Sequence, residues 1–231
     1  MKTKAASFRL FVLLALALAA TAGAAAAAPE TTEDGLVLVK KSKADAVYRR
    51  PGVAFSDYTK VTLLEPLIAF QKDWQEKHNR ENWRNQISDA DMATMIAKGK
   101  ELLKEEFTAV LNKKGYPVVA GSGKDVLGIR VLVLNLDVAA PDPNNAVGSF
   151  TKVYTEGAGS ATLVVELYDS VTWQVIARAF DHKMDQGTGH AGASERDHQT
   201  NVADASYAFH SWAQQLVKGL ERAKQSEADG K

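Results

Sequence analysis

Two stretches of the chain carry apolar residues at spacings of three and four, which is the pattern of an amphipathic helix. The first begins after Ser88, whose capping-box partner is Asp91, and it ends at Gly115. The apolar positions of the two stretches are Met92, Met95, Ile96, Leu103, Phe107, Val110 and Leu111, and then Val202, Ala205, Phe209, Trp212, Leu216, Leu220 and Ala223. We therefore expect two long helices, each of which buries one face against a core.

Alternation of apolar and polar residues predicts a β-hairpin in the second half of the chain. Residues 161–168 and 172–180 both alternate, and Asp169–Ser170 lies near the tight connection between them. In this register Trp173 shares the core face with Val175, Ala177 and Ala179.

Further strands are predicted on the N-terminal side of this hairpin. Residues 126–138 are apolar on both faces, which is typical of a central strand that is covered on both sides. Residues 59–70 predict an edge strand broken or bulged at Pro66, and residues 116–120 predict a short strand. Together the elements predict an α+β fold: a two-layer sandwich in which two long helices pack on a mostly antiparallel sheet of about four or five strands.

The N-terminus has the pattern of a secretory signal peptide. Lys2, Lys4 and Arg9 precede the apolar run 10–20, and small residues suited to cleavage lie just before Pro29. We expect residues 1–28 to be this leader. The mature chain is then expected to consist of an N-terminal arm (29–57), a single α+β domain (58–225) and a polar tail (226–231).

Composition adds constraints on location and partners. The 231 residues include 28 basic and 28 acidic side chains, and removal of the leader leaves 25 basic residues, a net charge of −3. This small net negative charge gives no reason to expect binding to nucleic acid or anionic lipid. The chain has no cysteine, so we expect neither a disulfide nor a lipid anchor. We expect a soluble periplasmic or secreted protein without a membrane span once the leader is removed.

Motifs of enzyme chemistry are few. The string Gly187–Gly192 matches G-x-G-x-x-G, but no parallel βαβ unit surrounds it, so we expect a loop and no nucleotide or other cofactor. No G-x-S-x-G motif is present. His182, His190 and His198 could hold a divalent metal, although their spacing matches no short metal motif and they could equally be solvated loop residues.

Two tryptophans in a polar stretch are the candidate binding residues. Trp74 and Trp83 lie within residues 71–87, with Asp73 beside the first, and show no apolar periodicity. Exposed aromatics in such a setting can anchor a partner protein or stack on a carbohydrate. The alternative is that they fold back as a lid over the end of the sheet.

Four ordered strings in the mature chain point to a known family. They are Ala44–Val53 (ADAVYRRPGV), Lys72–Gln75 (KDWQ), Lys114–Val119 (KGYPVV) and Leu167–Thr172 (LYDSVT). With them the chain resembles the bacterial domain-of-unknown-function 3313 family, whose members are mostly described as exported lipoproteins. The resemblance implies a single domain and an envelope location. It transfers no activity, and the lipid-bearing cysteine of many relatives is absent here.

These observations predict an exported, non-enzymatic binding or accessory protein of the bacterial cell envelope, whose partner is an envelope protein or a glycan. The alternative is an exported hydrolase, with or without a metal ion, that uses the His182–His198 region. Asp137, near the end of the predicted central strand, leaves a carboxylate-based hydrolase open as well.

Overall fold

A computed structural model describes residues 28–81, 83, 86–138, 153–155, 159–185, 194–196 and 198–230. The leader predicted over residues 1–28 lies outside this part except for Ala28. In chain order the elements are β1 (Val37–Leu38), β2 (Ala46–Arg49), the 3-10 helix η1 (Phe55–Asp57), β3 (Lys60–Leu63), β4 (Leu67–Phe70), α1 (Trp74–Glu81), α2 (Asp89–Lys113), β5 (Val126–Val138), β6 (Val153–Thr155), β7 (Gly159–Asp169), β8 (Val175–Asp185), β9 (Ser194–Arg196) and α3 (His198–Ala228).

The predicted α+β class is confirmed, but the sheet is larger and more mixed than expected. Within the described residues it has seven strands in the order β1-β2-β8-β7-β5-β3, with β4 also paired to β5. The neighbouring strands β1, β2, β8, β7 and β5 pair antiparallel in that order. Strands β3 and β4 both run parallel to β5. The expectation of four or five strands and two helices is therefore corrected to seven strands and three α-helices, with β6 and β9 forming a separate pair.

The stretch 59–70 forms two short edge strands instead of one. Pro66 lies in the gap between β3 and β4, where a residue without an N–H removes no ladder hydrogen bond. The two strands pair with successive parts of β5, since Lys60 lies opposite Val126 and Leu67 opposite Leu132. Residues 116–120 add only a single parallel bridge, between Val118 and Val61, to this edge.

Strands β7 and β8 form the predicted hairpin, but Trp173 does not face the core. The register between the strands shifts at Leu167/Tyr168, and β8 begins only at Val175. Trp173 thus falls in the turn, has a φ of 57°, and is 49% exposed. The sequence pattern assigned it wrongly because a shift of one residue moves a side chain to the other face.

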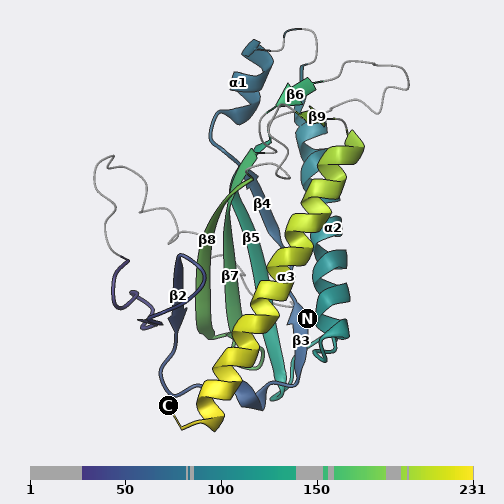
Figure 1. The fold of residues 1–231 in the computed structure, drawn as a ribbon. Helices are drawn as coiled ribbons and strands as arrows, with labels where there is room; N and C mark the ends of the chain where they lie inside the picture. The colour runs from purple at the N-terminus through teal and green to yellow at the C-terminus, as the bar shows by residue number, and fades with distance from the viewer. Residues whose placement is uncertain are drawn as a thin grey trace, which may run out of the picture.

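Helices α2 and α3 cover one face of the sheet. Figure 1 shows α3 crossing in front of the strands, with α2 beside it. Ser88 and Asp91 form the predicted capping box at the start of α2. The core between helices and sheet includes Leu103, Phe107, Val110 and Leu111 of α2, Phe209, Trp212, Val217 and Leu220 of α3, and Ile129, Val131 and Val133 of β5. Leu216, which the pattern placed in the core, is only partly buried.

The opposite face of the sheet is covered only in part by the N-terminal arm. Leu36 and Tyr48 form a second small core there, against which Phe180 packs. Next to it Arg178 of β8 forms ion pairs with Glu166 of β7 (2.9 Å) and with Asp34 of the arm (3.1 Å). On this face Leu132 and Leu134 of β5 are half-buried, so the cover on both sides that the sequence predicted is complete only under the helices.

The end of α3 is fastened to the N-terminal arm. Glu227 accepts hydrogen bonds from the backbone N–H groups of Phe55 (2.9 Å) and Ser56 (3.0 Å), and it pairs with Arg49 of β2. The Arg49 guanidinium also lies 4.7 Å from the centre of the Phe55 ring. The segments expected as an arm and a tail therefore contact each other through one carboxylate.

A second carboxylate joins the two long helices. Glu106 of α2 accepts a hydrogen bond from the Ser206 hydroxyl and lies 3.0 Å from Nδ1 of His210, both on α3. Because the glutamate contacts the serine and the histidine separately, the three do not form a relay in which histidine would activate serine. We interpret them as a clamp between α2 and α3.

The core assignment can be checked at two leucines of α3. Leu220→Ala should lower the free energy of unfolding by about 2–5 kcal/mol, because the side chain is buried and its loss leaves a cavity. Leu216→Ala should cost only about 1–2 kcal/mol, because that side chain is already partly in water. Urea denaturation measures both, and equal losses would contradict the orientation of α3.

Acid should weaken the carboxylate links. Burial raises the pKa of Glu227, but the N–H groups of Phe55 and Ser56 and the charge of Arg49 outweigh it and hold that pKa below its ordinary 4.5. The Ser206 hydroxyl, with help from His210, likewise lowers the pKa of Glu106. A carboxyl whose pKa is lower in the folded state stabilises the fold above its unfolded pKa, and this contribution is lost as pH falls through the folded pKa.

We therefore expect the free energy of unfolding to fall as pH drops below about 4.5. In Glu227→Gln the protein should be less stable at neutral pH and should lose less on acidification. Denaturant titrations of both proteins at neutral and acid pH give the comparison. An unchanged acid slope in the variant would show that Glu227 titrates alike in the folded and unfolded chain.

Candidate functional site

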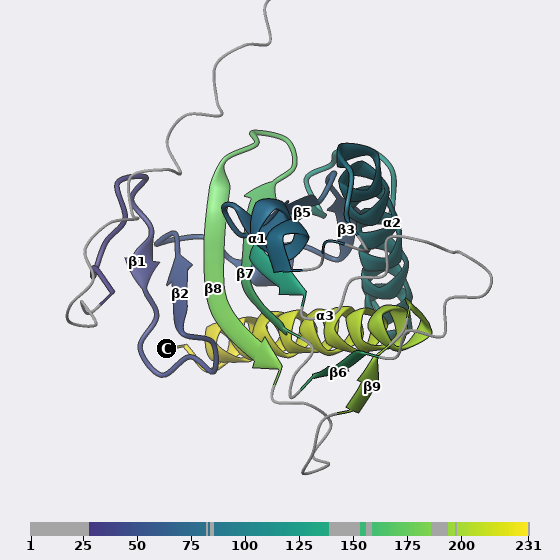
Figure 2. The same cartoon turned by 90° about the horizontal axis from the view of Figure 1, so that it is seen from above.

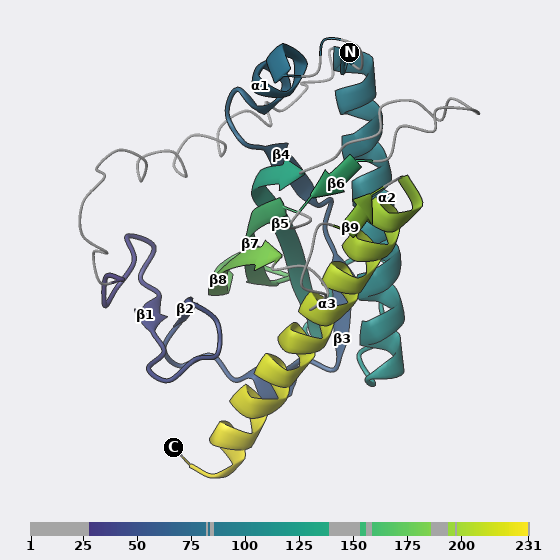
Figure 3. The same ribbon diagram turned by 45° about the horizontal axis from the view of Figure 1, so that its top comes forward.

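Helix α1 caps the end of the sheet at which β5 terminates. Figure 2 shows α1 over this end, and in Figure 3 it lies above β4 and close to the start of α2. The chain enters the helix through Asp73, which adopts a left-handed φ of 60° and accepts the N–H of Lys77 on its carbonyl. Asp73 is exposed, and the turn that it makes directs Trp74 back toward the sheet.

Trp74 is the buried anchor of this end. It is 5% exposed, and the centre of its ring lies 4.5 Å from that of Phe70 and 5.6 Å from that of His78. The indole Nε1 donates a hydrogen bond of 3.0 Å to the carboxylate of Asp137 on β5. A buried indole needs such an acceptor, because an unpaired N–H inside a protein is costly.

A bulge in β5 brings Asp137 to this position. The pairing between β5 and β7 shifts between Leu134 and Asp137, and Asn135 has a left-handed φ of 51°. Beyond the shift, Asp137 lies opposite Ser160 of β7. Bulges bend a strand and re-aim its side chains, and here the bulge lies two residues before the carboxylate that receives Trp74.

Two amide side chains hold the segment between α1 and α2. Asn79 donates to the carbonyl of Ile87 (2.9 Å) and accepts its N–H (2.7 Å), and Gln75 donates to the same carbonyl (3.0 Å). Ile87 itself is buried, immediately before the N-cap Ser88 of α2. The segment is thus bonded back onto α1 at its end.

Trp83 lies between the end of α1 and Ile87, and most of its side chain is exposed. Its exposed fraction is 72%, against 5% for Trp74. The two tryptophans that the sequence grouped together therefore differ: the lid alternative describes Trp74, whereas Trp83 has the exposure that an interface anchor needs. We call the group Trp74, Trp83, Asp73, Asp137 and Ile87 the α1 corner.

The sequence singled out Asp137 and Trp74 separately, and the structure joins them. The sequence analysis did not single out Gln75, Asn79 or Ile87. One signal was available, since an apolar residue directly before an N-cap such as Ser88 often packs against the helix start. A second local signal is that the amides at positions 75 and 79 lie one helical turn apart, so both side chains can reach the same backbone group.

Of the three histidines proposed for a metal, the structure describes the side chain of His182 alone, so the metal site stays a prediction. His182 is exposed on β8, its backbone N–H donates to Asp45, and its Nδ1 lies 3.4 Å from the Thr162 hydroxyl. His198 is the first residue of α3, and His190, with the string Gly187–Gly192, lies outside the described residues. Among the residues that are described, no cluster of three or more His, Cys, Asp or Glu side chains could hold a metal ion.

A shallow hollow of about 540 Å³ lies on another side of the molecule. It is lined by Glu65, Ala93, Ile96, Ala97, Lys100, Glu101 and Lys104. Glu65, which follows β3, forms ion pairs with Lys100 and Lys104 of α2, so the charges at its rim neutralise one another. Lys104 and Lys100 accordingly hold the pKa of the Glu65 carboxyl below its ordinary value.

Comparison with known proteins identifies the family. The family model described as "Protein of unknown function (DUF3313)" matches residues 30–216. The chain belongs to this family. The match spans nearly the whole described domain, from the N-terminal arm to α3, and it confirms the resemblance carried by the four strings. No curated protein matches the chain significantly. In the described part of the chain, no helix is both long and apolar enough to span a membrane.

Among solved structures the chain is similar to a PelC dodecamer (L103M variant) from Paraburkholderia phytofirmans, with 10% identity, a TM-score of 0.37, and coverage of 74% of this chain and 95% of that one. A Xanthomonas campestris protein matching the family model DUF330 has 11% identity, a TM-score of 0.42 and coverage of 78% and 93%. A DUF4136 family protein from Bacteroides thetaiotaomicron has 12% identity, a TM-score of 0.34, and coverage of 78% of this chain and 97% of that one. These scores support no conclusion about the function of the DUF3313 chain.

The two tryptophans of the α1 corner should separate in a stability measurement. Trp74→Ala should cost about 3–5 kcal/mol because it empties a packed site between Phe70 and His78. Trp83→Ala should change stability by less than about 0.5 kcal/mol, as expected for an exposed side chain. Trp74→Phe should cost about 1 kcal/mol, since it keeps a ring and loses the bond to Asp137. Thermal or urea unfolding of the three variants tests this order.

Proposed function

We propose that this DUF3313 protein is an exported, non-enzymatic binding or accessory protein of the bacterial cell envelope, and that the α1 corner is its recognition surface. The leader pattern of Lys2, Lys4 and Arg9 before an apolar run supports export. The observation that carries the binding role is Trp83, which exposes 72% of its surface between α1 and Ile87, a residue that is hydrogen-bonded to Asn79 of α1.

An anchor of this kind is effective because little has to be ordered when the partner arrives. Asn79 and Gln75 hold Ile87, and Trp74 fastens the base of α1 to β5. Helix α1 and Ile87, which precede and follow Trp83, are therefore fixed during folding and add no ordering cost when a partner binds. Tryptophan supplies a large apolar area, which suits both a protein pocket and a sugar ring.

Site-specific photocrosslinking tests the proposal in the bacterium that makes the protein. A benzophenone side chain at position 83 should give a discrete crosslinked species in the envelope fraction. The matched control is position 207 on α3, where Tyr207 is also exposed and aromatic and lies outside the α1 corner. Trp83→Ala, which is expected to fold normally, should abolish retention of the same partner on the immobilised protein.

The outcome against the proposal is equally specific. If position 83 gives no species that position 207 lacks, or if Trp83→Ala retains the partner unchanged, the α1 corner is not the recognition surface. Export is judged separately, from the intact mass of the protein in the periplasmic fraction, where a retained leader would contradict it.

A further inference from the structure

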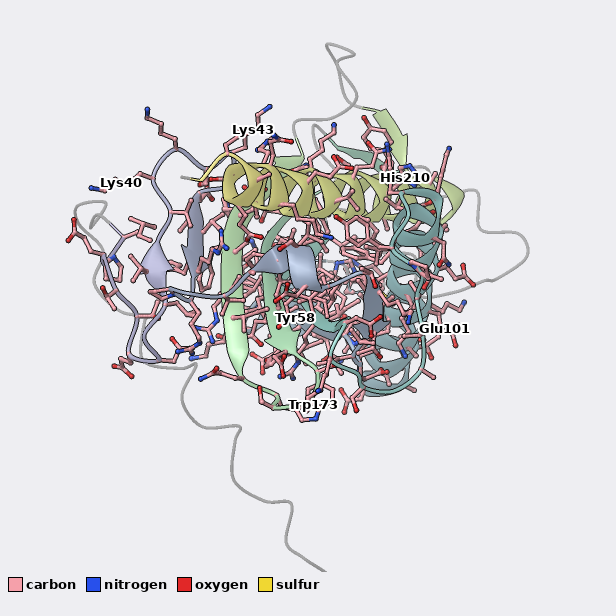
Figure 4. The ribbon with its side chains drawn as sticks, turned by 90° about the horizontal axis from the view of Figure 1, so that it is seen from below. Lys40, Lys43, Tyr58, Glu101, Trp173 and His210 are labelled. Atoms are coloured by element: carbon pink, nitrogen blue, oxygen red, sulfur yellow. The ribbon has the colours of Figure 1, made fainter. Side chains whose placement is uncertain are left out.

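The turn between β7 and β8 exposes two large apolar side chains at the other end of the sheet. Val171 is 54% exposed and Trp173 is 49% exposed. In Figure 4, which views the molecule from below, Trp173 lies at the margin of the molecule on the side away from α3. Residue 127 of β5 pairs with Asp169 at this end, whereas Asp137 marks the α1 corner, so roughly 30 Å of strand separate the two surfaces.

This turn is held in one conformation by its neighbours. The Asp169 carboxylate accepts hydrogen bonds from the N–H groups of Val171 (3.1 Å) and Thr172 (2.7 Å) and from the Tyr58 hydroxyl (3.0 Å). Ser170 is fully buried, and its hydroxyl donates to the carbonyl of Gly123 and accepts the N–H of the same residue, both at 3.0 Å. The apolar tip is therefore rigid.

The backbone at Trp173 is strained, and the strain fixes where the ring lies. Its φ of 57° is unusual for a bulky residue and persists only where the surroundings impose it. The ring extends over Gly128 of β5, where a Cβ would lie 3.5 Å from the indole and 3.2 Å from the Cβ of Tyr168. One side of the indole thus rests on the sheet while the rest faces solvent.

Four loops meet at this end of the molecule. Gly123 contacts Ser170, the carbonyl of Asp125 accepts the N–H groups of Thr59 and Lys60, and Val61 donates to Pro117 just after the end of α2. The charged side chains there are Lys60, Lys113, Lys114, Lys124, Asp57, Asp125 and Asp169. Lys60 and Asp125 pair with each other, at 2.9 Å. Within the described part of the chain no ion pair engages the other three lysines, and they outnumber the two remaining carboxylates, Asp57 and Asp169.

We propose that this end, with Val171 and Trp173 at its tip and Lys113, Lys114 and Lys124 around it, docks on the surface of a membrane that contains anionic lipid. Valine and tryptophan would enter the boundary between headgroups and acyl chains, where the amphipathic indole is favoured. The lysines would remain at the depth of the phosphates, attracted by the negative surface. This surface is independent of Trp83.

The charge around the apolar tip favours an anionic lipid surface as its partner. Three lysines without an ion pair in the described part of the chain flank two exposed apolar side chains, and positive charge beside a short apolar tip is complementary to phosphate headgroups above acyl chains. In a peripheral membrane contact, shallow apolar insertion and several cations act together. The net charge of the chain does not indicate this site, because it adds the three lysines at this end to acidic residues elsewhere in the molecule.

Vesicle flotation of the mature protein tests the docking. The protein should float with vesicles of phosphatidylethanolamine and phosphatidylglycerol at low salt, and binding should drop on phosphatidylcholine alone and at high salt. Lys124→Glu and Val171→Ser should each weaken binding about fivefold, through charge and apolar insertion respectively. Tyr207→Ser on α3 is the matched control for loss of an exposed apolar side chain and should bind like the unchanged protein.

Insertion of Trp173 can be read from its fluorescence. In a Trp83→Phe background the remaining tryptophans other than Trp173 are Trp74 and Trp212, both buried. Vesicles with brominated acyl chains should quench this protein, and the quenching should vanish in Trp83→Phe with Trp173→Phe. Absence of flotation on anionic vesicles would overturn the proposal. So would equal flotation of Val171→Ser and the unchanged protein, or quenching that survives loss of Trp173.

Discussion

The pairing of β5 along both of its edges is the constraint on which the molecule depends. This thirteen-residue strand holds β7 on one side and β3 and β4 on the other, and its helix-facing side supplies Ile129, Val131 and Val133 to the core. Its ends also position both exposed tryptophans. Asp137 receives Trp74 and so fixes the base of the α1 corner, while Gly128 leaves the space over which Trp173 lies. A change in the register of β5 would therefore displace both surfaces together.

Three of the four non-glycine residues with left-handed backbone in the described part of the chain lie where these contacts are made. Asp73, Asn135 and Trp173 each have a φ between 51° and 60°. Asp73 directly precedes Trp74, and Asn135 lies in the bulge before Asp137, the acceptor of Trp74. Trp173 itself carries the ring that lies over Gly128. Such conformations cost free energy and survive only when neighbouring bonds over-determine them. The bonds are visible here: Trp74 to Asp137 at one end, and the turn around Asp169 at the other. Strain of this kind is typical of positions that have to hold a side chain in place.

Local patterns predicted the elements whose stability is local. The capping box at Ser88 and Asp91 and the apolar stripe of α2 repeat within one helix, and the hairpin alternates within a few residues. Helix α1 escaped prediction because polar bonds from Asn79 and Gln75 to Ile87 hold it, and amides carry no apolar period. The parallel pairing of β3 and β4 with β5 escaped because it joins residues far apart in the sequence, and Trp173 was misplaced by one shift in register.

The candidate surfaces show why chemistry averaged over a chain can mislead. Charges in physiological salt act over about 8 Å, whereas the two ends of β5 are roughly 30 Å apart. A partner at the β7–β8 turn therefore experiences Lys113, Lys114 and Lys124, and a partner at the α1 corner experiences Trp83 and the residues around it. The net charge of 0 over the 231 residues describes neither end. Only the fold, by bringing loops at residues 57–60, 113–115, 121–125 and 169–174 together, decides which charges act as a group.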